Sequence, residues 1–253
     1  MRITVLCEDE RSLSARECLE KEPFVAERAG DMIILPIPTT RDKRRVEGSG
    51  ASLLSVASEL KLADIAVGYG LPEEFSLACA LRGAVALDIA LDESYQQEGA
   101  YLTALGLIKR LLTEHSLVPS ELSFGVIGYG RIGKILSEML LSLGATLCVY
   151  SAKELKSEKF RRLPYEALSN VQNEKFDFLI NTAPARLIPD GAITNSCSFD
   201  LIELASGDNL PLDAGAIKLM QLPMREFPKS AGRAVARSVI RSLISSMTDG
   251  AKL

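Results

Sequence analysis

The chain contains no tryptophan, and aromatic residues make up only 6% of its 253 residues. The hydrophobic core must therefore be built mainly from aliphatic side chains. The formal net charge is only -4, so the chain has no excess of positive charge to attract nucleic acid. No apolar run approaches the roughly 20 residues of a membrane-spanning helix. These absences predict an ordinary globular protein with neither a nucleic acid nor a membrane as partner.

Cysteine and histidine are also scarce. The five cysteines show no CxxC spacing, so we interpret them as small buried side chains in a reducing compartment and predict no metal site. No apolar stretch typical of a signal peptide precedes Glu8 and Asp9, which favours a cytoplasmic location. His115, the single histidine, follows a long helical pattern, where a cation satisfies terminal carbonyl groups. This position argues against the histidine-based acid–base catalysis of lactate-type dehydrogenases.

A glycine-rich turn is the most informative motif that the chain does contain. It follows the apolar run 124–127 and precedes an amphipathic helical pattern. In a dinucleotide-binding loop, the first glycine permits a tight turn, the second lets backbone approach a pyrophosphate, and the third lets the helix pack closely on the strand. The alternatives are a glycine turn without nucleotide and, for Arg131, an exposed first-turn residue. We predict that a dinucleotide contacts Gly128, Tyr129, Gly130, Arg131, Ile132 and Gly133.

Strand-like and helix-like segments alternate along the chain, which predicts an α/β fold with parallel sheets. We expect a Rossmann-type dinucleotide-binding domain and a smaller flavodoxin-like α/β domain, joined by a long connecting helix and the C-terminal helix. The small domain is expected over 1–94, with the helix 232–253 packing back on it. The connecting helix is expected over 95–117 and the Rossmann domain over 118–231.

Two features of the expected helices need a physical reason. Gly99 and Gly106 interrupt the connecting-helix pattern, and each costs about 1 kcal/mol relative to alanine. Close packing at both positions is the reason we expect. In the C-terminal helix, Arg233, Arg237 and Arg241 form a row, which we interpret as a solvated face, with a partner surface as the alternative.

The choice of cofactor is read at the end of the second strand of the nucleotide unit. NAD-binding loops carry an acidic residue about 20 positions beyond the glycines, where it binds the ribose hydroxyls. This chain has Ser151 and Lys153 there. A hydroxyl and an ammonium suit a 2′-phosphate, so we predict NADP, with NAD as the alternative. A merely solvated loop is the other interpretation of these two residues.

Further cofactor contacts are expected where later strands end, because open α/β sheets bind ligands at the carboxyl ends of their strands. We assign residues at two such ends to the ribose and nicotinamide side of the cofactor. Any strand end offers similar turn residues, which is the alternative interpretation. The residues are Asn181, Thr182, Ala183, Pro184, Ala205 and Ser206.

Several short motifs occur in an order that resembles one family. They are Ile33-Ile-Leu-Pro with Thr39-Thr40, Glu98-Gly99, the 128–133 loop, and the segments 178–184, 201–206 and 222–232. Together they resemble the A subunit of dipicolinate synthase and, more distantly, the NAD(P)-binding domains of D-2-hydroxyacid dehydrogenases. The chain departs from that family at residues 7–9, where the family has a glycine-rich turn. Its first domain also looks about one β-α step shorter.

The resemblance implies a pyridine-nucleotide oxidoreductase of spore-forming bacteria that oxidises a dihydrodipicolinate-type precursor to dipicolinate. The partner that it implies is a flavoprotein-like B subunit. Enzymes of this kind often form homo-oligomers. The alternatives are a nucleotide-binding subunit or sensor without turnover, and a dehydrogenase for another small acid.

A small dicarboxylic acid requires cations for its carboxylates and a nearby base. The candidates for substrate binding are Thr39, Thr40, Arg41 and Ser230, and the candidates for catalysis are Glu98 and Lys229. Ser230 has an alternative role as the cap of the final helix. For Glu98, the alternative is interaction with the helix dipole in a first turn.

Overall fold

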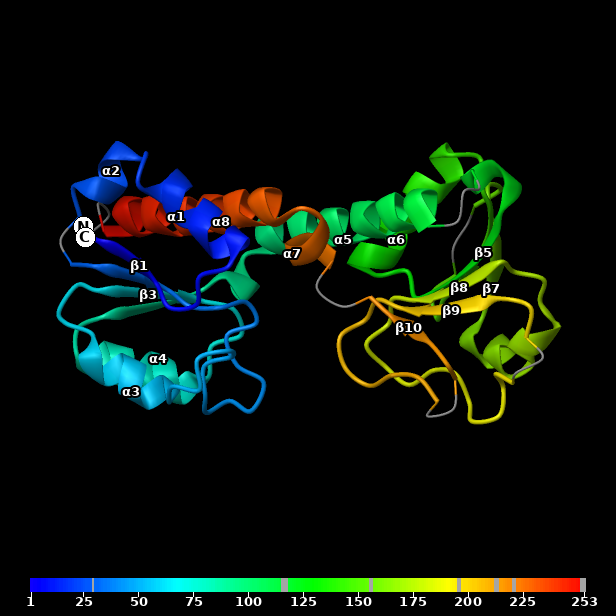
Figure 1. Ribbon diagram of the computed structural model, residues 1–253, viewed down its shortest axis with the longest axis horizontal. Helices are drawn as coiled ribbons and strands as arrows, with labels where there is room; N and C mark the ends of the chain where they lie inside the picture. The colour runs from blue at the N-terminus through cyan, green and yellow to red at the C-terminus, as the bar shows by residue number, and fades with distance from the viewer. Residues whose placement is uncertain are drawn as a thin grey trace. The chain divides into compact units, whose positions relative to one another are not determined.

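The computed structural model describes residues 1–28, 30–114, 118–154, 157–194, 197–211, 214–219 and 222–250. The chain forms two compact units, each with its own parallel sheet (Figure 1). The first unit comprises Met1–Gly99 and Phe227–Leu253, and the second comprises Ala100–Glu226. The long helix α5 (Glu93–Glu114) contributes to both units.

The first unit contains four parallel strands that lie in chain order, β1-β2-β3-β4. Helices cover both faces of this sheet, α1, α2 and α8 on one face and α3 and α4 on the other (Figure 1). These three layers confirm the expected small α/β domain, although flavodoxin itself has a strand order that reverses after its first strand. The strands are β1 (Ile3–Val5), β2 (Met32–Ile34), β3 (Ile65–Gly68) and β4 (Val85–Asp88). The helices are α1 (Glu10–Leu19), α2 (Pro23–Ala26), α3 (Leu53–Glu59), α4 (Glu73–Leu81), η1 (Ile89–Leu91) and α8 (Pro228–Gly250).

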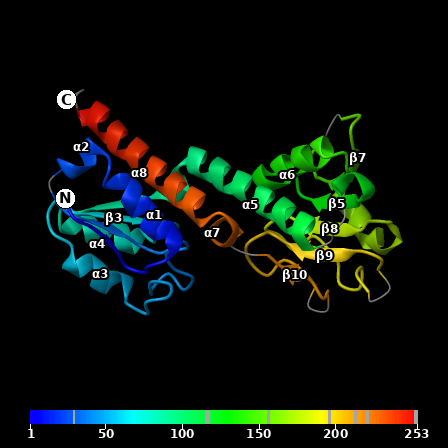
Figure 2. The same cartoon turned by 45° about the horizontal axis from the view of Figure 1, so that its top comes forward.

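The alternation of side chains along each strand divides the core of the first unit in two. Ile65 and Val67 of β3 pack toward α1 and α8, whereas Ala66 packs toward α3 and α4. Because successive side chains of a strand point to opposite faces, a strand covered on both faces is apolar along its whole length, as β3 is. α1 and α8 lie along one another (Figure 2), so a segment from the end of the chain completes this core.

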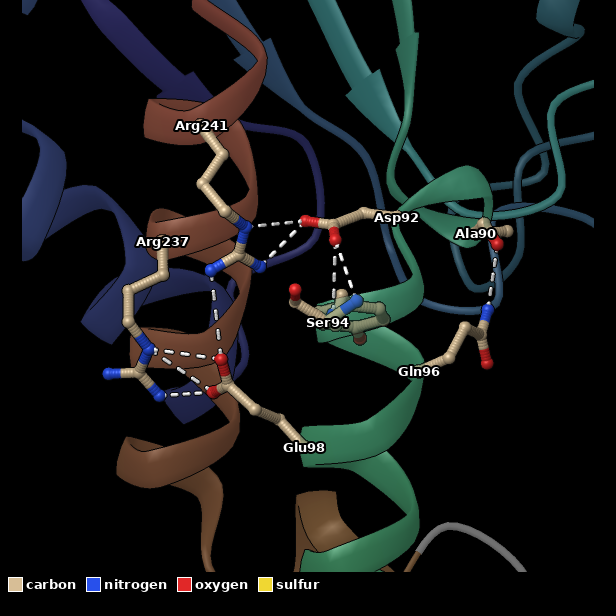
Figure 3. Close-up of polar contacts among 8 residues, drawn as sticks. Ala90, Asp92, Ser94, Gln96, Glu98, Arg237 and Arg241 are labelled. Atoms are coloured by element: carbon tan, nitrogen blue, oxygen red, sulfur yellow. Dashed lines mark hydrogen bonds and ion pairs between the residues drawn. The ribbon is translucent and has the colours of Figure 1, made fainter. Parts of the chain in front are cut away.

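Ion pairs fasten the start of α5 to α8 within the first unit (Figure 3). Asp92 accepts hydrogen bonds from the Ser94 N–H at 2.9 Å and from Arg241 Nη2 at 2.6 Å. Glu98 pairs with Arg237, and its Oε1 lies 3.8 Å from Nη1 of Arg241. Arg237 remains exposed, as expected for a solvated face, whereas Arg241 is partly buried. Both are also paired with acidic residues, Arg237 with Glu98 of α5 and Arg241 with Asp92 just before it.

The two glycines of α5 occupy different surroundings. A Cβ added at Gly106 would lie 3.1 Å from the Cβ of Leu222, so close packing is confirmed there. A Cβ added at Gly99 would meet no described atom within 4 Å. The expectation of close packing at Gly99 is wrong, since the helix passes open space at that position.

The second unit is a six-stranded parallel sheet of order β10-β9-β8-β5-β6-β7. Counted along the chain from β5, this is the strand order of a complete Rossmann fold. The prediction of a Rossmann-type domain is confirmed. Its strands are β5 (Ser123–Ile127), β6 (Thr146–Tyr150), β7 (Arg161–Leu163), β8 (Phe178–Asn181), β9 (Asp200–Glu203) and β10 (Ile217–Lys218).

Both faces of the second sheet are also covered. α5 from Ala100 onward, α6 (Arg131–Ser142) and α7 (Leu222–Glu226) pack on one face, where Phe124, Val126 and Val149 point. The helix η3 (Tyr165–Asn173) and the segments 187–194 and 197–199 cover the other face, and η2 (Pro119–Glu121) precedes β5. Strand β7 was not expected, because an edge strand is exposed and its arginines hide the apolar alternation.

None of the helices in the described ranges combines the length and the apolar character that crossing a bilayer requires.

We predict opposite stability effects for two glycine-to-alanine substitutions in the helices of the first unit. In α8, a Cβ at Gly232 would lie 2.3 Å from the carbonyl oxygen of Arg11, so Gly232→Ala should destabilise this unit by about 1–3 kcal/mol through overpacking. Gly99→Ala adds a methyl group in open space and should stabilise α5 by about 1 kcal/mol. Thermal unfolding followed by circular dichroism measures both changes. Equal midpoints for the two variants would contradict the packing of α8 on α1.

Candidate dinucleotide-binding site

The glycine loop between β5 and α6 satisfies the three requirements of a phosphate-binding turn. Gly128 has a φ of 95°, a conformation that side chains other than glycine rarely adopt. A Cβ at Gly133 would lie 2.2 Å from the carbonyl oxygen of Gly128, so helix and loop touch only because Gly133 has no side chain. A Cβ at Gly130 would meet no described atom within 4 Å. The backbone at the start of α6 is therefore open to a phosphate.

This loop lies at the point where the strand order of the second sheet reverses. β5 pairs with β6 on one side and with β8 on the other. The N–H of Gly128 donates to the carbonyl of Tyr150 at 2.9 Å, and the hydroxyl of Thr182 donates to the carbonyl of Ile127 at 2.9 Å. Ligands of doubly wound sheets bind at this reversal, beyond the carboxyl ends of the strands.

Ser151, directly after β6, is hydrogen-bonded to two basic residues, to the backbone of Lys153 and to the side chain of Arg162. Ser151 is 3% exposed, and its Oγ accepts the N–H of Lys153 at 3.1 Å. Arg162 of β7 donates from Nη2 to the carbonyl of Ser151 at 2.7 Å. The Nε of Arg162 is buried and has no hydrogen-bond partner among the described residues. Arg162 was absent from the candidate residues, because β7 was not expected.

A buried polar pair stands where β8 and β9 end. Asn181 and Glu203 are partners in the register of the two strands. The Nδ2 of Asn181 donates to both carboxyl oxygens of Glu203 at 3.1 Å, and the Ala205 N–H donates to Oε1 at 2.8 Å. Glu203 is fully buried. Burial raises the pKa of its carboxyl group, against the effect of these hydrogen bonds.

The remaining cofactor candidates surround these groups at the same edge of the sheet. Tyr129 packs its ring on Phe160, with centroids 5.8 Å apart, and burial raises the pKa of its hydroxyl. Arg131 and Ile132 form the first turn of α6. The other candidates follow β8 and β9: Thr182, Ala183, Pro184, Ala205 and Ser206. The structure thus gathers all predicted cofactor residues at the carboxyl ends of β5, β6, β8 and β9.

The candidates for substrate binding after β2 are engaged in contacts within the first unit. The hydroxyl of Thr39 is buried, donates to the carbonyl of Pro36 at 2.9 Å and accepts the N–H of Tyr69 at 2.8 Å. Thr40 donates to Asp42 at 3.1 Å, and Arg41 pairs with Glu47 at 3.0 Å. A hydroxyl with both roles filled, as in Thr39, orders the loop that contains it.

The candidates for catalysis also lie in the first unit. Glu98 is held by Arg237 and faces Arg241. Lys229 is exposed, with its Nζ 4.0 Å from Glu10. Ser230 lies inside α8, which begins at Pro228, so its alternative role as the helix cap is wrong. His115 lies outside the described residues.

Three residues with unusual environments were missed by sequence reasoning: Arg11, Arg162 and Glu203. Glu203 stands inside the apolar segment 201–206, where a carboxylate flanked by leucine and isoleucine is itself a signal. Arg162 follows a polar loop and carries no such signal. Arg11 follows Glu8, Asp9 and Glu10, and so resembles one charge of a solvated run. Across the described ranges, no group of three histidine, cysteine or acidic side chains is arranged to hold a metal ion.

The strand order and the glycine loop together define the second unit as a Rossmann-type dinucleotide-binding fold. No protein-family model and no curated protein matches the sequence.

Solved structures do match over nearly their full lengths. The A subunit of dipicolinate synthase from Bacillus halodurans has a TM-score of 0.71 at 17% identity, covering 96% of this chain and 97% of that chain. The A chain of dipicolinate synthase from Bacillus subtilis has a TM-score of 0.74 at 16% identity, covering 99% and 97%. The D-isomer specific 2-hydroxyacid dehydrogenase from Lactobacillus delbrueckii ssp. bulgaricus, in its NAD-complexed form, has a TM-score of 0.54 at 12% identity, covering 98% of both chains. These matches confirm, at the level of the fold, the resemblance of the sequence motifs to the A subunit of dipicolinate synthase.

We predict a pH-dependent stability difference between the wild type and Glu203→Gln. In the unfolded chain the carboxyl group titrates near pH 4.3, whereas burial raises its pKa in the folded protein. Stability contributed by the protonated form is therefore complete below about pH 4.3 and is lost as the pH rises through the folded-state value.

Glutamine cannot ionise, so the melting temperature of Glu203→Gln should gain on that of the wild type between about pH 4 and pH 8. Thermal unfolding of both proteins over this range measures the difference. A difference that stays constant with pH would show that the buried carboxyl group does not titrate with a raised pKa.

Proposed function

We propose that this protein is an NAD(P)-dependent oxidoreductase that binds its nucleotide at the carboxyl edge of the second sheet. The observation that carries the proposal is the glycine loop at the reversal of the Rossmann strand order. There Gly128 has a positive φ, Gly130 is open and Gly133 touches the loop backbone. A glycine turn serving only the fold would need the first and third features but not the open second position. The NAD-complexed form of the 2-hydroxyacid dehydrogenase with this fold supports the same assignment.

The preferred cofactor in this proposal is NADP. The ribose end of the site lacks an acidic residue directly after β6 and instead has Ser151, Lys153 and, from β7, Arg162. A carboxylate there would accept hydrogen bonds from the ribose hydroxyls of NAD but repel a 2′-phosphate. A guanidinium and an ammonium attract that phosphate.

The proposed reaction is the oxidation of a dihydrodipicolinate-type acid to dipicolinate. Its support is the fold shared over full length with two dipicolinate synthase A chains and the order of the sequence motifs. Forming the aromatic ring removes two hydrogens, one as hydride to the nicotinamide and the other as a proton to a base. In this proposal Glu98 accepts the proton and Lys229 binds a carboxylate. Thr40, Arg41 and Ser230 are further substrate-binding candidates from the same sequence motifs. A flavoprotein-like partner and a homo-oligomer belong to this proposal.

A second candidate function is nucleotide binding without turnover by the chain alone. It is favoured by the contacts of the predicted substrate residues, since Thr39, Arg41 and Glu98 all have partners within the first unit. In this alternative, the chain turns over only with a partner protein, or acts as a sensor.

The cofactor assignment is tested by measuring the dissociation constants of NADPH and NADH. The wild type should bind NADPH more tightly. Arg162→Gln should weaken NADPH binding about tenfold, the effect of one charge-assisted contact, and leave NADH nearly unchanged. Arg161→Gln is the matched control, because Arg161 pairs with Glu174. Tighter binding of NADH by the wild type would refute the NADP assignment, whereas no binding of either nucleotide would refute the proposed function.

The reaction is tested by mixing the protein with NADP and dihydrodipicolinate and following the absorbance of the reduced nicotinamide, with and without the flavoprotein partner. The absorbance should rise, and Gly133→Val should abolish the rise, because its side chain would collide with the Gly128 carbonyl. A rise only with the flavoprotein present would favour the second candidate function. No rise in either mixture, with nucleotide binding intact, would exclude this substrate.

A further inference from the structure

Arg11 is a cation that the first unit buries without an acidic partner. It is the second residue of α1 and is only 6% exposed. Its Nη2 donates to the carbonyl of Ile37 at 2.5 Å, and its Nε has no hydrogen-bond partner in the described part of the chain. Among the described residues, no carboxylate forms an ion pair with it. Burying a charged group without a counter-charge costs free energy. A buried arginine without an ion-pair partner therefore indicates a functional role.

Asp9 and Glu10, which directly precede Arg11 in the sequence, interact with other residues. Asp9 caps α1, with its Oδ1 accepting the N–H of Ser12 at 2.8 Å. Glu10 faces Lys229, with 4.0 Å between the two charged groups. Burial lowers the pKa of the Arg11 guanidinium, and the nearby charge of Asp9 opposes this effect only in part, so Arg11 lies near a carboxylate without forming an ion pair with it.

The surroundings of Arg11 are those of a ligand site on an α/β sheet. Its guanidinium reaches the segment after β2, Tyr69 directly follows β3, and Tyr95 lies in the first turn of α5 after β4. These are the carboxyl ends of three adjacent parallel strands, the edge at which such sheets bind ligands. The rings of Tyr69 and Tyr95 lie 6.1 Å apart, and Gln96 donates to the hydroxyl of Tyr69 at 3.3 Å. Burial raises the pKa of Tyr95 to about 12, so its hydroxyl is neutral and able to donate.

We propose that Arg11 is the residue that binds a carboxylate of the substrate, with Tyr69 and Tyr95 beside it. The inference rests on the proposed function in taking a small organic acid as substrate, and it assigns the carboxylate to a residue outside the motifs of the family resemblance. Arg41 is the less suitable cation, since it is half exposed and already paired with Glu47. A planar guanidinium matches the two oxygens of a carboxylate and gains strength where water is excluded.

The test is calorimetric titration of pyridine-2,6-dicarboxylate into the full chain without nucleotide, using the wild type, Arg11→Met, Arg11→Lys and the control Arg16→Met. Arg11→Met should weaken binding at least about tenfold, because a charge-assisted pair is lost. Arg11→Lys should bind at an intermediate strength, since it keeps the charge but loses the fork. Arg16→Met should bind as the wild type does, because Arg16 lies on the same helix as Arg11 and pairs with Glu20. NADPH binding should be equal in all four proteins.

Two measurements separate carboxylate binding from a purely structural role of Arg11. Pyridine-2,6-dicarboxamide, which has the same shape without charge, should bind the wild type at least about tenfold more weakly. This comparison needs no variant and holds even if Arg11→Met unfolds. Equal binding of the two compounds, or a folded Arg11→Met that binds the dicarboxylate like the wild type, would overturn the inference.

The outcomes also distinguish this inference from the proposed function. A wild type that binds NADPH but not the dicarboxylate overturns the role of Arg11 and leaves the nucleotide site standing. A wild type that binds the dicarboxylate through Arg11 but neither nucleotide supports the inference and refutes the oxidoreductase.

Discussion

The contact between Gly133 and the carbonyl of Gly128 is the constraint on which the nucleotide site depends. It sets how closely α6 approaches β5, and it does so through the absence of a side chain. Because α6 sits this close, its first N–H groups face the open space beside Gly130. The hydrogen bonds from Gly128 to Tyr150 and from Thr182 to Ile127 then hold the ends of β6 and β8 at the same loop. A small change in this packing would displace every other group of the site.

Each of the two units contains an arginine in a similar environment. Arg11 and Arg162 each donate to a backbone carbonyl at the carboxyl ends of parallel strands, and neither forms an ion pair among the described residues. By contrast, the charges that join α5 to α8 are paired with one another. Paired charges specify how helices pack, whereas unpaired cations leave part of their interaction energy for an anion.

Much of the fold could be predicted from the sequence, because buried parallel strands and amphipathic helices leave strong periodic signals. The Rossmann domain follows from the run before Gly128, the glycine spacing and the stripe after Gly133. Strand β7 could not be predicted, since an exposed edge strand needs no apolar alternation. The wrong expectation of close packing at Gly99 has a related cause. The sequence pattern shows that a glycine lies in the helix, but not which residues pack against it.

The candidate site was less predictable than the fold. A residue that follows a strand can be assigned to the carboxyl edge from the sequence alone, as for Asn181 and Ser151. Whether its polar atoms are free depends on contacts between distant segments. The hydroxyl of Thr39 is hydrogen-bonded to both Pro36 and Tyr69, and Glu98 is hydrogen-bonded to an arginine 139 positions away in the sequence. Arg11 shows the converse, since only its tertiary surroundings distinguish it from a solvated charge.

The division of the chain into units has a consequence for biosynthesis. The second unit is one continuous segment, whereas the first takes α8 from beyond it. Val235, Val239 and Leu243 of α8 supply part of the core over β1, β2 and β3. During translation, the second unit can fold as soon as Glu226 has emerged, while the first sheet still has an uncovered apolar face. The core of the first unit can therefore be completed only after α8 has emerged, whereas an N-terminal domain ordinarily folds first during synthesis.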